Sequence, residues 1–205
     1  MIPSIAIENL LKGLPLFPEA FERAFAHLVQ REGYYAHVKG DRGGMTYMGV
    51  ARTFWPKLTL WMLIDAYVER LGRPLRWNER IDDPVIEARV KAFYYQHFWN
   101  KIKADQISSA SVAELLFDSY VHSGNRAIEW IQQAANEVGA IHLAVDRQFG
   151  PRTLAALNAC DAQRLFITLK ALRAAYLGWL ADNVSGQAKF KRGWMNRINA
   201  FRYEA

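Results

Sequence analysis

The stretch that decides the fold runs from Glu32 to Gly49 and reads EGYYAHVKGDRGGMTYMG. It contains five of the thirteen glycines in the chain, and no apolar residue in it recurs at the spacing of a helix. Glycine adopts the left-handed backbone conformations that tight turns require. We therefore predict a glycine loop or short β-hairpin over about residues 34–50, inserted into a chain whose remaining pattern is helical.

Helical patterns lie on both sides of this stretch. Pro18 suits the first position of a helix, and the apolar residues from Phe21 to Val29 recur at helical spacing, which predicts a helix over residues 18–32. Asp83 and Asp161 each precede a helical pattern in the position of an N-cap. The predicted fold class is therefore mainly α, with helical bundle lobes and one short hairpin. Further helices are expected over about residues 50–55, 59–72, 83–94, 111–124, 127–138, 161–180 and 190–198.

A polar, serine-containing segment over residues 103–111 is the weakest joint in this pattern. Domain boundaries fall in such segments because few contacts cross them. We predict an N-terminal extension over residues 1–17, a first lobe over residues 18–105 and a second, helical lobe over residues 106–205.

Composition narrows the class of protein. The chain has 205 residues, 51% of them hydrophobic, which supports a substantial core and excludes a disordered or collagen-like protein. A single cysteine, Cys160, excludes a disulfide-stapled mini-protein. Lys and Arg outnumber Asp and Glu by 26 to 20, which gives +6, and residues 186–205 alone contribute five cations against Glu204, or +4. With seven tryptophans, this charge favours a polyanionic or carbohydrate partner.

The first thirty residues do not have the pattern of a secretory signal. The apolar run over residues 5–16 is interrupted by Glu8, Asn9 and Lys12, and no basic segment precedes it. No uncharged run approaches the length of a membrane span. We therefore expect a protein that is made in the cytoplasm without a signal peptide and that does not insert stably into a membrane.

Most reactive motifs are missing from the sequence. It has no Walker loop, no G-x-S-x-G elbow, no H-E-x-x-H and no C-x-x-C pair, and its five histidines show no metal-ligand spacing. We therefore expect no metal and no other cofactor, and carboxylate chemistry is what remains.

Three residues of the glycine-rich stretch suit glycoside hydrolysis. Glu32 continues the apolar stripe at the end of the first helix, where partial burial and the negative end of the helix dipole favour the protonated acid. Asp41 lies in a polar loop, where an ionised carboxylate can orient a water molecule, and the Thr46 hydroxyl can help to hold that water. The alternatives are a solvated helix end for Glu32 and a turn-forming role for Asp41.

Other candidates flank these residues. Tyr34, Tyr35 and Tyr47 can stack on sugar rings, or one or two of them can pack under the loop. A second wall of a cleft is predicted from the end of the helix before Gly124, with core packing or helix capping as the alternative for each residue; its members are Asp118, Tyr120 and Asn125. Four tryptophans on apolar faces are expected in the core: Trp99, Trp130, Trp179 and Trp194.

The block from Glu32 through Asp41-Arg-Gly-Gly-Met-Thr46 to Gly49 resembles the signature of the glycoside hydrolase family 108 N-acetylmuramidases. The resemblance implies an α+β, lysozyme-like fold and cleavage of the β-1,4 bond between N-acetylmuramic acid and N-acetylglucosamine. It also implies that Glu32 is the general acid, that Asp41 orients the water and that Thr46 assists. Similarity continues at Tyr95-x3-Trp99, Phe117-Asp118-x2-Val121-x2-Gly124, Asp146-x3-Gly150-x2-Thr153 and Phe190-x2-Gly193-Trp194-x2-Arg197.

The last two of these segments resemble the peptidoglycan-binding region that accompanies the catalytic part of the family. The resemblance therefore implies that Asp146, Gly150 and Thr153 belong to a peptidoglycan-binding region in the second lobe, and that the first lobe is catalytic.

The function predicted from the sequence is that of a bacteriolytic phage endolysin, a monomeric muramidase with peptidoglycan and not nucleic acid as its partner. It would reach the periplasm and cell wall by holin-type release. If Asp41 positions water, the reaction should invert the anomeric configuration. The alternatives are a non-catalytic wall-binding or secretion-associated module of the same fold, and membrane disruption by the basic C-terminal helix.

Overall fold

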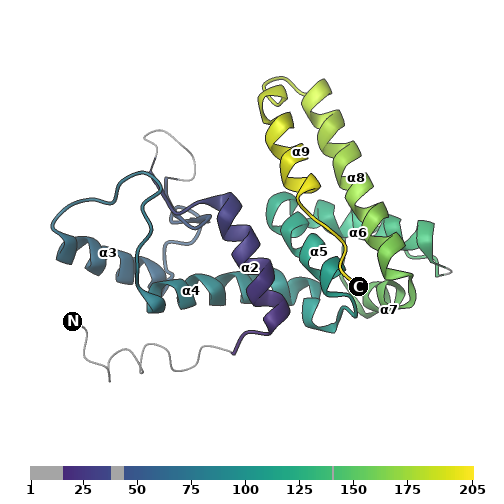
Figure 1. The fold of residues 1–205 in the computed structure, drawn as a ribbon, viewed down its shortest axis with the longest axis horizontal. Coiled ribbons are helices and arrows are strands. Elements are labelled where there is room, and N and C mark those ends of the chain that lie inside the picture. The colour runs from purple at the N-terminus through teal and green to yellow at the C-terminus, as the bar shows by residue number, and fades with distance from the viewer. Residues whose placement is uncertain (1–15, 38–43, 140) are drawn as a thin grey trace. The chain divides into compact units, whose positions relative to one another are not determined.

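A computed structural model describes residues 16–37, 44–139 and 141–205. This part of the chain consists of helices and one small antiparallel sheet (Figure 1), which confirms the mainly helical, α+β fold class. Asp41 lies outside the described residues, as does most of the predicted N-terminal extension.

The chain divides into two compact units. Unit 1 contains the sheet, and unit 2 contains the five helices α5 to α9. The predicted boundary between a catalytic and a peptidoglycan-binding lobe at residues 105 and 106 stays a prediction. The described residues of unit 1 are 16–17, 25–37 and 44–96, and those of unit 2 are 18–24, 97–139 and 141–205.

The elements follow one another in a simple order. Two of them contain residues of both units: helix α2 and the π-helix η1. The first part of the chain forms α2 (Glu19–Glu32), β1 (Tyr35–His37), β2 (Met45–Tyr47), β3 (Val50–Ala51), α3 (Thr59–Leu71), α4 (Pro84–Tyr94) and η1 (Tyr95–Trp99). The second part forms η2 (Asn100–Ile102), η3 (Ala104–Gln106), α5 (Ala110–Ser123), α6 (Asn125–Val138), α7 (Pro151–Ala159), α8 (Ala162–Asn183), η4 (Ala188–Phe190) and α9 (Lys191–Asn199).

The three strands of unit 1 pair in chain order. Tyr35 lies opposite Tyr47, and Tyr47 also lies opposite Val50. Because side chains alternate along a strand, these three residues share one face of the sheet, and all three are buried. The helix predicted over residues 50–55 is wrong. A two-residue turn after Tyr47 folds the chain back, so Val50 and Ala51 pair as strand β3 and turns follow them.

The core of unit 1 contains buried residues of the second half of α2, of α3, of α4 and of this sheet face, and α3 packs on α4. Phe25 and Leu28 continue the predicted stripe of α2 into this core, and the Phe25 ring lies 5.9 Å from that of Tyr94 on α4. Helix α4 begins as predicted, because the Asp83 carboxylate accepts hydrogen bonds from the backbone of the second and third helical residues.

The core of unit 2 lies between α5, α6 and α8, which pack on one another, while α9 runs back along α8 (Figure 1). A cluster of edge-to-face rings from α2, η1 and α5 is also fully buried in unit 2, formed by Phe21, Trp99 and Phe117. The N-cap predicted at Asp161 is confirmed. Helix α7 was not predicted, because it is short and Pro151 at its start follows an irregular segment.

Candidate active site

The candidate general acid stands at the end of helix α2. Glu32 is the last residue of that helix, and Gly33 leaves it with φ of +72°, in the left-handed region that favours glycine. The Glu32 side chain is half-buried. Its Cγ and Oε2 lie 3.2 and 3.3 Å from the point where a Cβ on Gly49 would stand. The carboxyl group therefore packs directly against the turn between β2 and β3.

That turn is tightly specified. Met48 and Gly49 are its two central residues, and both have positive φ, +48° and +78°, as a type I′ hairpin turn requires. The Tyr94 hydroxyl, which is buried, donates a hydrogen bond of 2.8 Å to the Met48 carbonyl. A Cβ on Gly49 would overlap this hydroxyl. Glycine is thus needed here both for its φ and for the close approach of Glu32 and Tyr94.

The backbone that follows Glu32 is held from two sides. The Met48 amide donates to the Tyr34 carbonyl at 2.9 Å. On the other side, the Tyr34 amide donates to Asn78 Oδ1 at 2.9 Å, and the Asn78 amide donates to the Tyr35 carbonyl at 2.7 Å. These bonds join the residues after the acid to the β2–β3 turn and to the loop between α3 and α4. The position of Glu32 therefore depends on hydrogen bonds to the backbone after it that come from two other segments of unit 1.

Thr46 lies on strand β2, three residues before Gly49. It is opposite Ala36 and Ala51, on the face of the sheet away from Tyr35 and Tyr47. Its hydroxyl donates a long bond of 3.4 Å to the Ala36 carbonyl, and its side chain is partly exposed. The same hairpin thus carries Thr46 and, at Gly49, the contact with Glu32. The position of Asp41 relative to Thr46 and Glu32 stays a prediction.

The tyrosines near the acid differ in exposure, and for two of them sugar stacking has to be corrected. Tyr47 is 1% exposed, and its hydroxyl accepts a 3.0 Å bond from the Ile81 amide. Burial raises the pKa of Tyr47 to about 12. Tyr35 is also buried, which raises its pKa. Both rings pack under the hairpin and offer no face to a ligand, whereas Tyr34 is half-buried.

Asp118 was predicted on a cleft wall, and the structure corrects this. It is 2% exposed on α5 in unit 2, with carboxylate oxygens 2.8 Å from guanidinium nitrogens of both Arg173 and Arg197. Burial alone would raise the pKa of this carboxyl, but the two arginines lower it overall. Arg173 is itself completely buried. Asp118 is therefore the centre of a buried ion cluster, which favours the alternative of core packing over contact with a ligand.

The other two residues predicted on that wall remain accessible. Tyr120 is half-buried, its ring lies 6.0 Å from that of Phe98, and burial raises its pKa. Asn125 is exposed at the start of α6. Their contact with a ligand stays a prediction.

The segment predicted to bind peptidoglycan is organised by Gln132 of α6, a residue that the sequence did not single out. This side chain is 1% exposed. Its Nε2 donates to Asp146 Oδ1 at 2.8 Å and to Thr153 Oγ1 at 3.3 Å, and its Oε1 accepts from the Asp146 amide. The bond from Gln132 is the main cause of a lowered Asp146 pKa. Gly150 precedes α7 as its N-cap residue. These contacts give Asp146 and Thr153 a role in ordering the loop, and a role in binding stays a prediction.

Two of the four tryptophans expected in the core are not buried. Trp179 is 55% exposed on α8 and Trp194 is half-buried on α9, whereas Trp99 and Trp130 are buried as expected. Trp77, which the sequence did not single out, is 71% exposed in the loop between α3 and α4. Its position in a polar segment without helical pattern was the available signal for such exposure.

Within the described part of the chain, no group of three or more His, Cys, Asp or Glu side chains is placed to hold a metal ion. Nor does any helix in that part have the length and apolar character that crossing a membrane would require.

Comparison with known proteins gives matches over most of the chain. Residues 25–124 match the family described as Glycosyl hydrolase 108, and residues 126–199 match the family described as Predicted Peptidoglycan domain. Among solved structures, that of Brucella abortus SagA is similar, with 26% sequence identity and a TM-score of 0.57. The match covers 87% of this chain and 89% of that one. No curated protein matches the sequence.

Proposed function

Because residues 25–124 of this chain belong to the glycosyl hydrolase 108 family and residues 126–199 to a peptidoglycan domain family, we propose that the protein is an N-acetylmuramidase with Glu32 as general acid. Family membership makes it a glycoside hydrolase that acts on peptidoglycan. The proposed bond is the β-1,4 link between N-acetylmuramic acid and N-acetylglucosamine. The observation that carries the proposal is the half-buried Glu32 carboxyl, held against the Met48–Gly49 turn.

The chemistry follows from this position. The protonated Glu32 carboxyl gives its proton to the glycosidic oxygen, the bond from the anomeric carbon to that oxygen breaks, and positive charge develops on the sugar. A water molecule then attacks the anomeric carbon and loses a proton to the second carboxylate. We assign this role to Asp41, and we assign to the Thr46 hydroxyl the holding of the water. An inverting reaction requires the two carboxyl groups to be about 6.5–9.5 Å apart.

The identity of the cleaved bond and the anomeric configuration of the product can be tested together. Purified sacculi are digested, and the products are identified by mass spectrometry after reduction of their new ends. We expect reduced muramic acid at those ends, with none produced by Glu32→Gln. Reduced glucosamine would contradict the proposed bond, and an anhydro-muramic product would indicate a lytic transglycosylase. Proton NMR of fresh product should show the α-anomer first, and a β-anomer appearing first would contradict inversion.

We also propose that the protein works as an endolysin, and a cell-lysis assay separates this from a non-catalytic wall-binding module. Chloroform-treated Gram-negative cells should clear with the wild type and not with Glu32→Gln. Equal clearing by both would contradict an enzymatic role for Glu32. The membrane-disruption alternative stays a prediction. Of the apolar residues near the C-terminus on which it depends, Ile198 is 1% exposed and Trp194 is half-buried, whereas Phe190 is 45% exposed.

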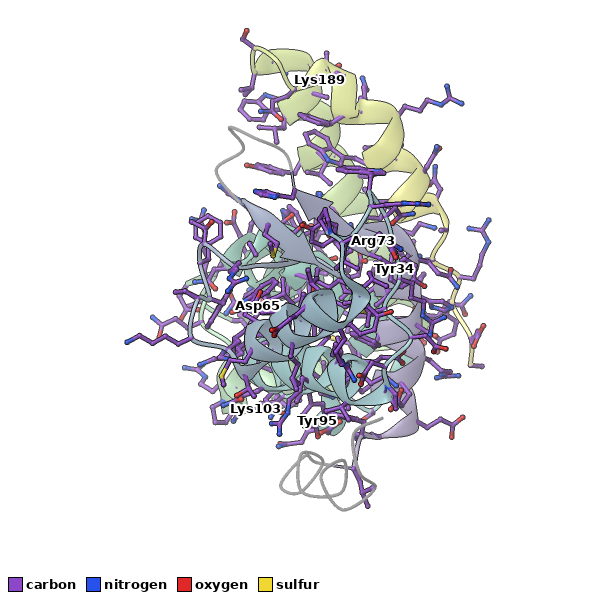
Figure 2. All side chains as sticks on the ribbon, turned by 90° about the vertical axis from the view of Figure 1, so that its left-hand side faces the viewer. Tyr34, Asp65, Arg73, Tyr95, Lys103 and Lys189 are labelled. Atoms are coloured by element: carbon purple, nitrogen blue, oxygen red, sulfur yellow. The ribbon has the colours of Figure 1, made fainter. Side chains whose placement is uncertain are left out.

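The basic C-terminal segment has a smaller role in this proposal than its charge suggests. Arg197 pairs with the buried Asp118, and Lys191 pairs with Asp182 at 2.7 Å. Part of the +4 is therefore matched within the protein. Lys189, labelled in Figure 2, lies in the connection between α8 and α9, with its Nζ 5.0 Å from the centre of the Phe190 ring. Attraction to an anionic envelope should accordingly be modest and should weaken with salt.

A further inference from the structure

We propose that Trp77 forms a glycan-binding subsite beside Glu32, where its indole ring stacks on a pyranose ring of the peptidoglycan strand. The inference rests on the proposed function, since it assigns a binding residue to the same site. It is carried by the hydrogen bonds that fix the Trp77 loop to the residues after Glu32, and by the exposure of the ring.

The first observation is where the loop is attached. Asn78 follows Trp77 directly, and it binds the backbone of Tyr34 and Tyr35 through its side chain and its amide. Asn78 Oδ1 also lies 2.9 Å from the point where a Cβ on Gly33 would stand. Trp77 is therefore one residue away from a contact with the residue that follows the general acid. A glycan whose scissile bond lies at Glu32 has further sugars on both sides, which need such neighbouring subsites.

The second observation is that the loop is held firmly. Arg73, labelled in Figure 2, donates two bonds of 2.9 and 2.8 Å to the Glu79 carboxylate. The Arg76 amide donates to the same carboxylate at 2.7 Å, and these bonds lower the pKa of Glu79 to about 2. Farther along the chain, the Ile81 amide donates a hydrogen bond to the Tyr47 hydroxyl. The Glu79 carboxylate thus holds the backbone on both sides of Trp77 together, and the bond from Ile81 to Tyr47 fixes the end of the loop to the core of unit 1.

The third observation is that the Trp77 ring is available. It is 71% exposed, and among the described residues its indole has no hydrogen-bond, ring or cation partner. The neighbouring Tyr34 ring differs, because the Arg80 guanidinium lies over it at 5.7 Å. A large apolar ring on a fixed loop gains by covering itself with the C–H face of a sugar, and little freedom is lost when it does so.

Binding can be measured without turnover. Soluble glycan strands of alternating N-acetylglucosamine and N-acetylmuramic acid are titrated calorimetrically into the Glu32→Gln protein. Adding Trp77→Ala should raise the Kd by about three- to tenfold, while Trp77→Tyr should keep most of the affinity because it retains a ring. Met62→Ala is the matched control, since Met62 is 72% exposed on α3, and it should leave the Kd unchanged.

Kinetics of the otherwise wild-type protein give the second readout. Trp77→Ala should raise KM by a similar factor with kcat nearly unchanged, and its melting temperature should equal that of the wild type because the ring is exposed. An unchanged Kd for folded Trp77→Ala would overturn the subsite. Hydrolysis of the strands by Glu32→Gln would instead overturn the role of Glu32, so the two failures are distinguishable.

Discussion

Two carboxyl groups on amphipathic helices have opposite surroundings in this protein. Glu32 ends α2 in unit 1, half-buried against a glycine turn. Asp118 lies within α5 in unit 2, fully buried between Arg173 and Arg197. The charge of Asp118 is matched inside the protein, so its ionisation serves stability. The contacts around Glu32 place it by backbone geometry at a partly exposed position, which suits the proton transfer proposed for it.

The largest effect expected from this comparison is on catalysis. Glu32→Gln keeps the shape of the side chain and its contact with Gly49 but removes the transferable proton. Release of reducing ends from sacculi should fall by about 100- to 10,000-fold. The melting temperature should change little. A variant that loses activity only in proportion to a loss of folded protein would mean that Glu32 is a structural residue.

Asp118→Asn should show the reverse pattern. Removing the charge leaves the fully buried Arg173 and the 12% exposed Arg197 side chain without their partner, and breaking a buried ion pair lowers the free energy of unfolding by about 3–5 kcal/mol. Activity per folded molecule should remain. Urea unfolding measures the first quantity, and turnover at a temperature where the variant is folded measures the second.

The matched control for this variant is Asp182→Asn, which breaks the exposed pair with Lys191 and should cost less than about 1 kcal/mol. A specific loss of activity in folded Asp118→Asn would restore Asp118 as a ligand-binding residue.

The same two carboxyl groups show how far the sequence could predict the site. The stripe of α2, the glycine hairpin and the place of Glu32 between them follow from local pattern, and all were predictable. The role of Asp118 was not, because Arg173 and Arg197 lie 55 and 79 residues farther along the chain. Tyr47 was misjudged for a similar reason, since its partner Ile81 comes from a distant loop. The subsite proposed at Trp77 was not predictable either, because it depends on the contact of Asn78 with Tyr34, which joins two distant segments.

Gly49→Ala tests the geometric side of the comparison. Its φ of +78° is disfavoured for alanine by about 1–2 kcal/mol, and the added Cβ would also press on Glu32 and overlap the Tyr94 hydroxyl. We expect a loss of stability above that amount, together with lower activity per folded molecule. Gly186→Ala is the control, because its φ of +79° is nearly the same and nothing lies within 4 Å of the added atom. Equal effects of the two substitutions would show that the close approach at Gly49 is unimportant.

The smallest effect expected is on the pH dependence of stability, and it belongs to the Asp118 cluster. Burial, with the charges of Arg173 and Arg197, lowers the pKa of His122 to about 4, although Asp118 acts in the opposite direction. In the unfolded chain the pKa is about 6.5. The neutral ring therefore contributes stability that is fully present above about pH 6.5 and is lost as the pH falls toward 4. His122→Asn should lack this component. Between pH 7.5 and 5, the free energy of unfolding of the variant should therefore fall by about 1–2 kcal/mol less than that of the wild type. Both free energies of unfolding are measured with urea at the two pH values. An equal fall for the two proteins would show instead that His122 is protonated as easily in the folded protein as in the unfolded one.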